Sequence, residues 1–209
     1  MKQNMKKWVS ETIAAPKKKA IPVLSFPSIQ LLGITVNELI ADSKTQADGM
    51  LAVANRCPAG AAVSMMDLSV EAEAFGCPIE VLDDEIPRVT GHIVQSAEDA
   101  ESLQIPTVGT ERTGVYIDAI RMVAEQLEDR PVFAGTIGPF SLVGRLMDMS
   151  QAMLACRRDP NLITCLLEKS TTFLIDYISA YKAAGANGVV IAEPAAGLLS
   201  PRMIKKFSC

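Results

Sequence analysis

The chain has 209 residues with 49% hydrophobic and 21% charged side chains, and its formal net charge at pH 7 is -4. These values are typical of a globular protein and exclude a disordered or fibrous chain. The negative charge argues against a protein that binds nucleic acid or acidic membranes, and no apolar run approaches the roughly 18 residues that cross a bilayer.

An amphipathic helix is predicted at the N-terminus, because apolar residues recur at helical spacing at Met5, Trp8, Val9 and Ile13. The segment lacks the continuous apolar region of a secretory signal. A solvated basic turn follows at Lys17 to Lys19. We therefore divide the chain into an N-terminal helix with its turn, residues 1–20, and a domain over residues 21–209.

The first predicted strand is the apolar segment Ile21–Phe26. Two helices are predicted next, over residues 36–41 and 44–55. The second of them begins with a capping-box pattern formed by Ser43 and Gln46. Such a box supplies hydrogen-bond partners for backbone N–H groups that the first helical turn leaves unpaired.

The second predicted strand, Ala61–Met66, runs directly into the polar segment 67–76, which is predicted to be a loop or short helix ended by Gly76. Residues 79–94 are predicted to form short extended pieces outside the main alternation of strands and helices. A long helix is predicted over residues 112–127.

The third predicted strand is Pro131–Thr136, and the fourth is Gly188–Ala192. Between them, Asp159 followed by proline predicts the start of a long helix, since aspartate caps well and proline fits the first turn. The helix is predicted to end near Gly185, because glycine readily adopts the left-handed C-cap conformation. Ser200 followed by proline predicts one last helix.

This alternation predicts an α/β fold with parallel strands. Four strands, each followed by a helix, fit either an open sheet or the first half of a (β/α)8 barrel of the TIM type. The chain is shorter than the roughly 250 residues of a closed barrel. The five cysteines form no C-x-x-C pair, so neither a disulfide framework nor a zinc knuckle is indicated, and a reducing, cytoplasmic compartment is expected.

Candidate functional groups lie directly after the predicted strands, where α/β folds present residues to a ligand. Asp67 follows the second strand and Glu193 follows the fourth. These two carboxylates are therefore candidate catalytic residues at one mouth of the fold. The alternative is that Asp67 caps the following short helix while Glu71 and Glu73 are solvated.

The third strand ends in a glycine-containing turn, Gly135–Ser141, that leads into a helix. Glycines let a backbone approach a ligand, and the N–H groups of a helix start favour an anion, although such turns are also purely structural. Cofactor contacts are expected at this turn and after the second strand, from Met66, Ser69, Gly135, Gly138 and Ser141.

Several common functional motifs are missing from the sequence. It contains neither a P-loop nor a dinucleotide-binding glycine fingerprint, which argues against nucleotide hydrolysis and dinucleotide binding. The single histidine, His92, lies in no Ser-His-Asp pattern and is interpreted as a structural or surface residue.

The strand-end motifs resemble those of the uroporphyrinogen decarboxylase superfamily. Met66–Gly76 resembles the second-strand motif of its cobamide-dependent methyltransferases, which methylate coenzyme M. Thr136–Leu142 and Glu193–Pro201 are similar to the superfamily's third- and fourth-strand motifs. The resemblance implies a TIM barrel, of which this chain holds the first four βα units, and places Asp67 where the decarboxylases carry a substrate-binding aspartate.

The resemblance to the methyltransferases implies methyl transfer from a corrinoid carrier to a thiol such as coenzyme M, with a corrinoid protein as partner. In that branch, zinc bound by a His-x-Cys pair and a later cysteine holds the thiol as the nucleophilic thiolate. No His-x-Cys pair occurs here, so no metal ligand is assigned. Zinc and corrinoid are expected for the intact family member only.

Two alternatives stay open. One is uroporphyrinogen decarboxylase of porphyrin biosynthesis, although Ser25–Gln30 stands in place of an arginine-containing stretch that grips the substrate and Arg145 in place of an expected tyrosine. The other is a non-catalytic half barrel, either a truncated fragment or a subunit that needs a partner carrying the other half. An isolated half exposes a strand edge and apolar interior, which a homodimer would cover.

Overall fold

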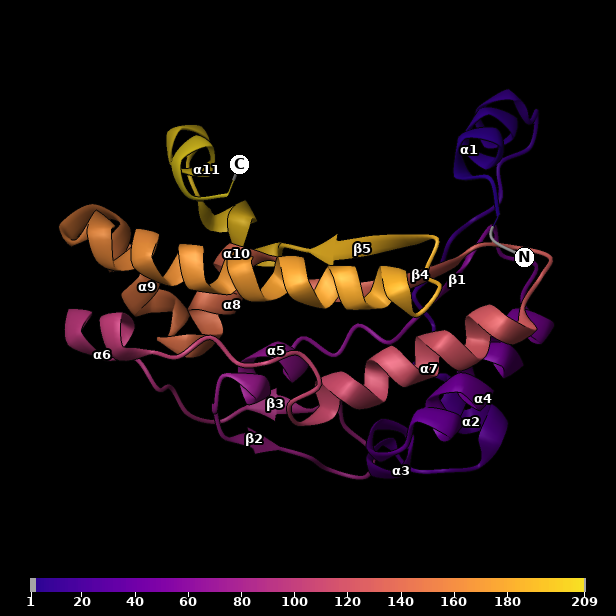
Figure 1. Ribbon diagram of the computed structural model, residues 1–209, viewed down its shortest axis with the longest axis horizontal. Helices are drawn as coiled ribbons and strands as arrows, with labels where there is room; N and C mark the ends of the chain where they lie inside the picture. Colours follow the sequence, from indigo (N-terminus) through magenta and orange to yellow (C-terminus); the bar gives the residue numbers. More distant parts are fainter. Residues whose placement is uncertain (1–2, 209) are drawn as a thin grey trace.

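The computed structural model describes residues 3–208 and is built on a three-stranded parallel sheet (Figure 1). Its strands are β1 (Ala62–Val63), β4 (Val132–Ile137) and β5 (Gly188–Ala192), arranged in the order β1-β4-β5. The central strand β4 pairs with β5 over five residue pairs and with β1 over two. Because the strands are parallel, the segments that follow them lie at one edge of the sheet.

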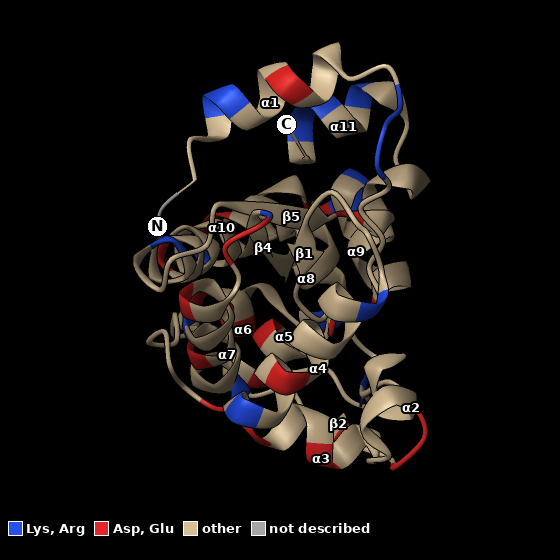
Figure 2. Ribbon diagram, turned by 90° about the vertical axis from the view of Figure 1, so that its right-hand side faces the viewer, with Lys and Arg blue, Asp and Glu red and all other residues tan. Residues whose placement is uncertain are grey.

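Helices lie on both sides of this sheet (Figures 1 and 2). On one side, α10 (Pro160–Ala183) packs against α7 (Arg112–Gln126), and α4 (Ser43–Arg56) packs against α7 and β1. On the other side stand α1 (Met5–Ala14) and α11 (Pro201–Phe207). The predicted α/β alternation is therefore confirmed for three of the four strands.

Shorter elements connect these layers. β2 (Ile79–Glu80) and β3 (Arg88–Val89) form an antiparallel pair, which confirms the extended pieces predicted over residues 79–94. Within the described part of the chain, no helix is long and apolar enough to cross a bilayer. The remaining elements are α2 (Ser28–Leu32), α3 (Val36–Ala41), α5 (Val70–Ala74), α6 (Ala97–Ser102), α8 (Pro139–Leu146), α9 (Met149–Arg158) and the 3-10 helix η1 (Pro194–Leu198).

The segment Ile21–Phe26 is not a strand, which corrects the first of the four strand predictions. Ser25 Oγ donates to the carbonyl of Val63 at 3.0 Å, so the segment does lie beside β1. Two features prevent a ladder: Pro22 has no backbone N–H to donate, and β1 is only two residues long.

The N-terminal helix α1 is present, but its apolar residues stay largely exposed. Trp8 contacts Phe133 of β4 edge-on, with the ring centroids 5.7 Å apart. Val9 and Ile13 are 45% and 72% exposed. The predicted division into residues 1–20 and 21–209 remains a prediction, and its outermost residues, 1–2 and 209, lie outside the described part of the chain.

Three predicted helix ends are confirmed. The side chains of Asp159 and Ser200 cap α10 and α11, and Gly185 has a left-handed φ of 106° after α10. The predicted capping box of α4 is wrong, because Asp42 rather than Ser43 is the N-cap. The Asp42 carboxylate accepts a hydrogen bond from the backbone N–H three residues later at 2.7 Å, which is the bond an N-cap must supply.

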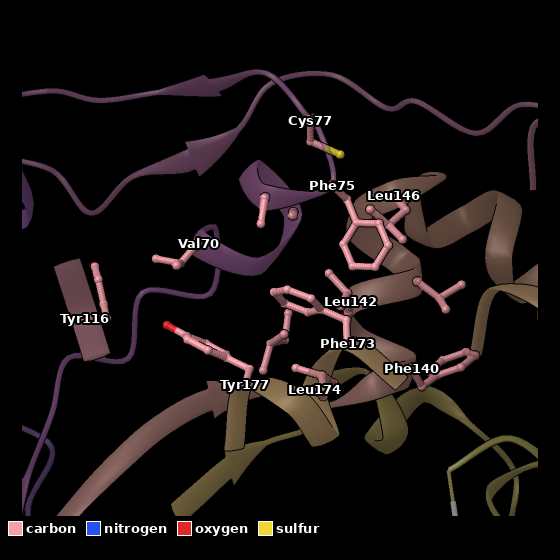
Figure 3. Close-up of a cluster of buried hydrophobic side chains, with 14 of the residues drawn as sticks. Val70, Phe75, Cys77, Tyr116, Phe140, Leu142, Leu146, Phe173, Leu174 and Tyr177 are labelled. Atoms are coloured by element: carbon pink, nitrogen blue, oxygen red, sulfur yellow. The ribbon is translucent and has the colours of Figure 1, made fainter. Parts of the chain in front are cut away.

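The core is centred on α10, whose aromatic residues recur one turn apart. The rings of Phe173 and Tyr177 lie 5.7 Å apart, and those of Tyr177 and Tyr181 lie 4.5 Å apart. Phe75, which follows α5, meets Phe173 edge-on at 5.3 Å, and Figure 3 shows these two rings beside Leu142 of α8. This packing fixes the segment after β1 against the helices around it.

Replacing Lys169 with methionine is expected to lower the free energy of unfolding by about 1–3 kcal/mol, because charged hydrogen bonds at a helix end are lost. The ammonium group of Lys169 donates to three carbonyls at the end of α6, those of Ala100, Glu101 and Leu103, at 2.6–2.7 Å. Urea unfolding measures the change. The exposed Lys182→Met variant is the control, and equal effects in both would contradict the prediction.

Candidate functional site

Asp67, the first predicted catalytic residue, lies after β1 with its side chain fully buried. Its Oδ1 accepts hydrogen bonds from the backbone N–H of Ser69 at 3.0 Å and from the Ser69 hydroxyl at 2.6 Å. Its Oδ2 accepts from the Tyr116 hydroxyl at 2.8 Å and pairs with the Arg112 guanidinium. Four donors therefore saturate both oxygens of this carboxylate.

Arg112, the first residue of α7, links Asp67 to a second carboxylate. Its Nε donates to Glu73 Oε2 at 2.6 Å and its Nη2 to the Ser69 hydroxyl at 2.9 Å. Burial and the adjacent Asp67 charge raise the pKa of Tyr116 well above its usual value, so its hydroxyl stays a donor. These contacts anchor α7 to the segment after β1.

Glu71 is fully enclosed, and Glu73 is paired with Arg112 and mostly buried, so the alternative in which both are solvated is wrong. Its Oε1 accepts from the Thr136 hydroxyl at 2.6 Å and from the backbone N–H of Ile137 at 3.1 Å. Its Oε2 is buried and has no partner among the described residues. Burial raises the pKa of this carboxyl from 4.5 to about 7, because the charged form is poorly solvated there.

Glu193, the second predicted catalytic residue, caps the N-terminus of α8. Its Oε2 accepts from the N–H of Phe140 at 2.9 Å, and its Oε1 accepts from the N–H of Ser141 at 2.6 Å and from the Ser141 hydroxyl. A Cβ at Gly138 would overlap the Glu193 carboxylate. Glycine is therefore required at 138 for this close approach, and the carboxylate lies where the helix dipole favours negative charge.

Replacing Glu193 with glutamine is expected to lower the free energy of unfolding by about 1–2 kcal/mol, because a neutral amide loses the charge-assisted bonds to the start of α8. Chemical denaturation at neutral pH measures the loss. Glu168→Gln, at an exposed position of α10, should change stability by less than about 0.5 kcal/mol. A loss no larger than that of the control would contradict the capping role.

The predicted cofactor contacts fall into three groups. Ser69 belongs to the Asp67 cluster, while Gly138 and Ser141 surround Glu193. Gly135 faces Met66, because a Cβ at Gly135 would overlap the Met66 sulfur. In the described part of the chain, no hydrogen bond or ion pair joins Asp67 to Glu193. The roles of all these residues remain predictions.

A pocket of about 310 Å³ opens between α8, α9 and η1 at the strand ends. It is lined mostly by apolar side chains, with Arg145 of α8 as the one charged residue among those that line it. His92 is not among the residues that line this pocket, and its Nδ1 contacts the Arg145 carbonyl at 3.0 Å. Among residues 3–208 there is no group of three or more His, Cys, Asp or Glu side chains that could hold a metal ion.

The partners of Asp67 are the functional residues that sequence reasoning missed. Arg112 and Tyr116 lie 45 and 49 positions along the chain from Asp67. The sequence does show that both residues lie one turn apart at the start of the predicted helix over residues 112–127. Their spacing does not indicate which residue they contact. Only the packing of α7 beside α5 brings them together.

Comparison with known proteins gives four matches. Residues 12–209 match the family model described as uroporphyrinogen decarboxylase (URO-D). The chain is 31% identical over 160 residues to a uroporphyrinogen decarboxylase of Coxiella burnetii, and 31% identical over 147 residues to a methylcobamide:CoM methyltransferase of Methanosarcina acetivorans. It is similar in fold to a methyltransferase from Methanosarcina mazei, with a TM-score of 0.85 and 24% identity.

The matched regions cover most of this chain but less than half of each curated relative. They include 73% and 68% of this chain, but only 44% of the decarboxylase and 43% of the methylcobamide:CoM methyltransferase. The fold match includes 98% of this chain and 64% of the solved methyltransferase. The chain therefore spans less than half the length of the curated relatives it matches.

Proposed function

The chain belongs to the uroporphyrinogen decarboxylase family, whose fold is a TIM barrel, and we propose that within this family it serves methyl transfer rather than decarboxylation. The proposed reaction moves a methyl group from a corrinoid carrier to a thiol such as coenzyme M. The thiolate sulfur forms a bond to the methyl carbon, the cobalt–carbon bond breaks with its electron pair left on cobalt, and the thiol proton is released.

The observation that carries this proposal is the saturation of Asp67. By the resemblance described above, Asp67 occupies the position at which the decarboxylases carry a substrate-binding aspartate. A carboxylate with that role must present a free oxygen to the substrate, whereas both oxygens of Asp67 are occupied by Ser69, Arg112 and Tyr116 and its side chain is fully buried. We therefore assign Asp67 a positioning role, with Glu193 holding α8 at the adjacent strand end.

The described residues do not fit the zinc ion of the methyltransferase branch. No cluster of three ligand side chains occurs among residues 3–208, so no step at zinc is assigned to this chain. We propose that the chain forms the first βα units of a half barrel, with a corrinoid protein and the other barrel half, or a second copy, as partners. A cytoplasmic location remains a prediction.

The test compares two reactions on the purified chain, each with and without a partner that supplies the other barrel half. With methylcobalamin and coenzyme M, we expect a loss of the cobalt–methyl absorbance that depends on the thiol and on that partner. With uroporphyrinogen, we expect no release of carbon dioxide. Release of carbon dioxide would instead support the decarboxylase reading. If the chain binds methylcobalamin but neither reaction occurs, the non-catalytic, partner-dependent subunit becomes the better description.

A further inference from the structure

Arg145 differs from the other charged residues at the strand ends because its guanidinium is not used within the fold. Its side chain is exposed and forms no hydrogen bond or ion pair with the other described residues. Only its backbone carbonyl is engaged, by His92 and by the Cys77 thiol. By contrast, Arg112 and Arg130 are held by carboxylates beside them. An arginine that folding does not use is available for a ligand.

The position of Arg145 on α8 directs it to the strand-end pocket. Ser141, Gly144 and Arg145 are three and four residues apart, a spacing that places them on one helix face, and all three line the pocket. The adjoining face of α8 carries Leu142 and Leu146, which are fully buried. Apolar walls come from three other segments, through Leu68, Met149 and Leu198.

The carboxylates near this pocket already have hydrogen-bond or ion-pair partners within the fold. Glu193 is held by the N-terminal N–H groups of α8, and Asp67 is paired with Arg112. Asp148 caps α9 by accepting from the N–H groups of Ser150 and Gln151 at 2.9 and 3.1 Å. The positive charge of Arg145 therefore has no counter-charge among the residues that line the pocket.

We propose that Arg145 binds the anionic end of the thiol acceptor, a small organic sulfonate or carboxylate, while the apolar walls take its methylene carbons. A planar guanidinium offers paired N–H donors that suit such an anion, and about 310 Å³ accommodates a molecule of this size. The inference rests on the proposed methyl transfer, because that reaction supplies the thiol acceptor.

The test is direct binding to the full chain, measured by isothermal titration. Three probes share a thiol and a short carbon chain: 2-mercaptoethanesulfonate, 3-mercaptopropionate and the neutral 2-mercaptoethanol. We expect the wild type to bind the two anions at least about tenfold more tightly than the neutral probe. Arg145→Gln should abolish this preference, and Arg145→Lys should restore part of it.

Arg157→Gln is the matched control, since Arg157 is an exposed arginine of the neighbouring α9 and lies outside the pocket lining; it should bind like the wild type. A wild type without preference for the anions, or an Arg145→Gln variant that keeps it, would overturn the inference. Anion binding through Arg145 without methyl transfer, even when a partner supplies the other barrel half, would refute the proposed function alone. Methyl transfer with a coenzyme M KM unchanged in Arg145→Gln would refute the inference alone.

Discussion

Replacing Arg112 with leucine is expected to lower the free energy of unfolding by about 3–5 kcal/mol, the largest effect of any single substitution considered for this chain. The change removes one member of a mostly buried ion pair and leaves the buried Asp67 carboxylate without its counter-charge. The side chains of Arg112 and Asp67 are 12% and 0% exposed, so solvent cannot take over the lost interaction.

Urea unfolding followed by circular dichroism measures this change. The matched control is Arg121→Leu on the same helix, because Arg121 pairs with Asp118 while both side chains are 49% exposed. An exposed pair of this kind contributes at most about 1 kcal/mol. Adding Asp67→Asn to Arg112→Leu should recover part of the loss, since it removes the stranded charge. Similar losses in the two arginine variants would refute the anchoring role of Arg112.

The elements that could be predicted are those whose signals are local. The helix over residues 36–41 and the strand Gly188–Ala192 have the predicted bounds, and Asp159 caps α10 as expected, because apolar periodicity and capping residues act within a few positions along the chain. The segment 21–26 has the apolar composition of a strand. Pro22 already weakens its pairing, and the rest depends on the length of the neighbouring strand β1, which the sequence of the segment does not contain.

The difference between local signals and contacts of distant segments also explains which features of the site could be predicted. Asp67 and Glu193 were found because they follow strands, and a strand end is a local feature. Their partners come from distant segments, Arg112 from α7 and the N-terminus of α8, so their saturation was not visible. Glu71 was expected to be solvated because the five-residue helix α5 is too short to show a buried face. Its contact with Thr136 arises only when α5 packs beside β4.

Replacing Glu71 with glutamine is expected to remove a loss of stability that the wild type shows as the pH rises. The pKa of Glu71 is about 7 in the folded protein, against 4.5 for a free side chain. Between these values the folded state keeps a proton that the unfolded state has released. Stability from this group is therefore complete below about pH 4.5 and falls as the pH rises towards 7, by about 3 kcal/mol in all.

The glutamine variant cannot lose this proton, and its carbonyl still accepts from Thr136 and Ile137. We therefore expect its free energy of unfolding to exceed that of the wild type increasingly between pH 5 and about 8, as measured by urea unfolding at each pH. Glu125→Gln, at an exposed position of α7, is the control. It should follow the wild-type curve, because it keeps Glu71 and lacks only one exposed carboxyl group. A Glu71→Gln curve parallel to the wild type would mean that Glu71 is ionised in the fold. The buried Oε2 would then require a donor that the residues around it do not supply.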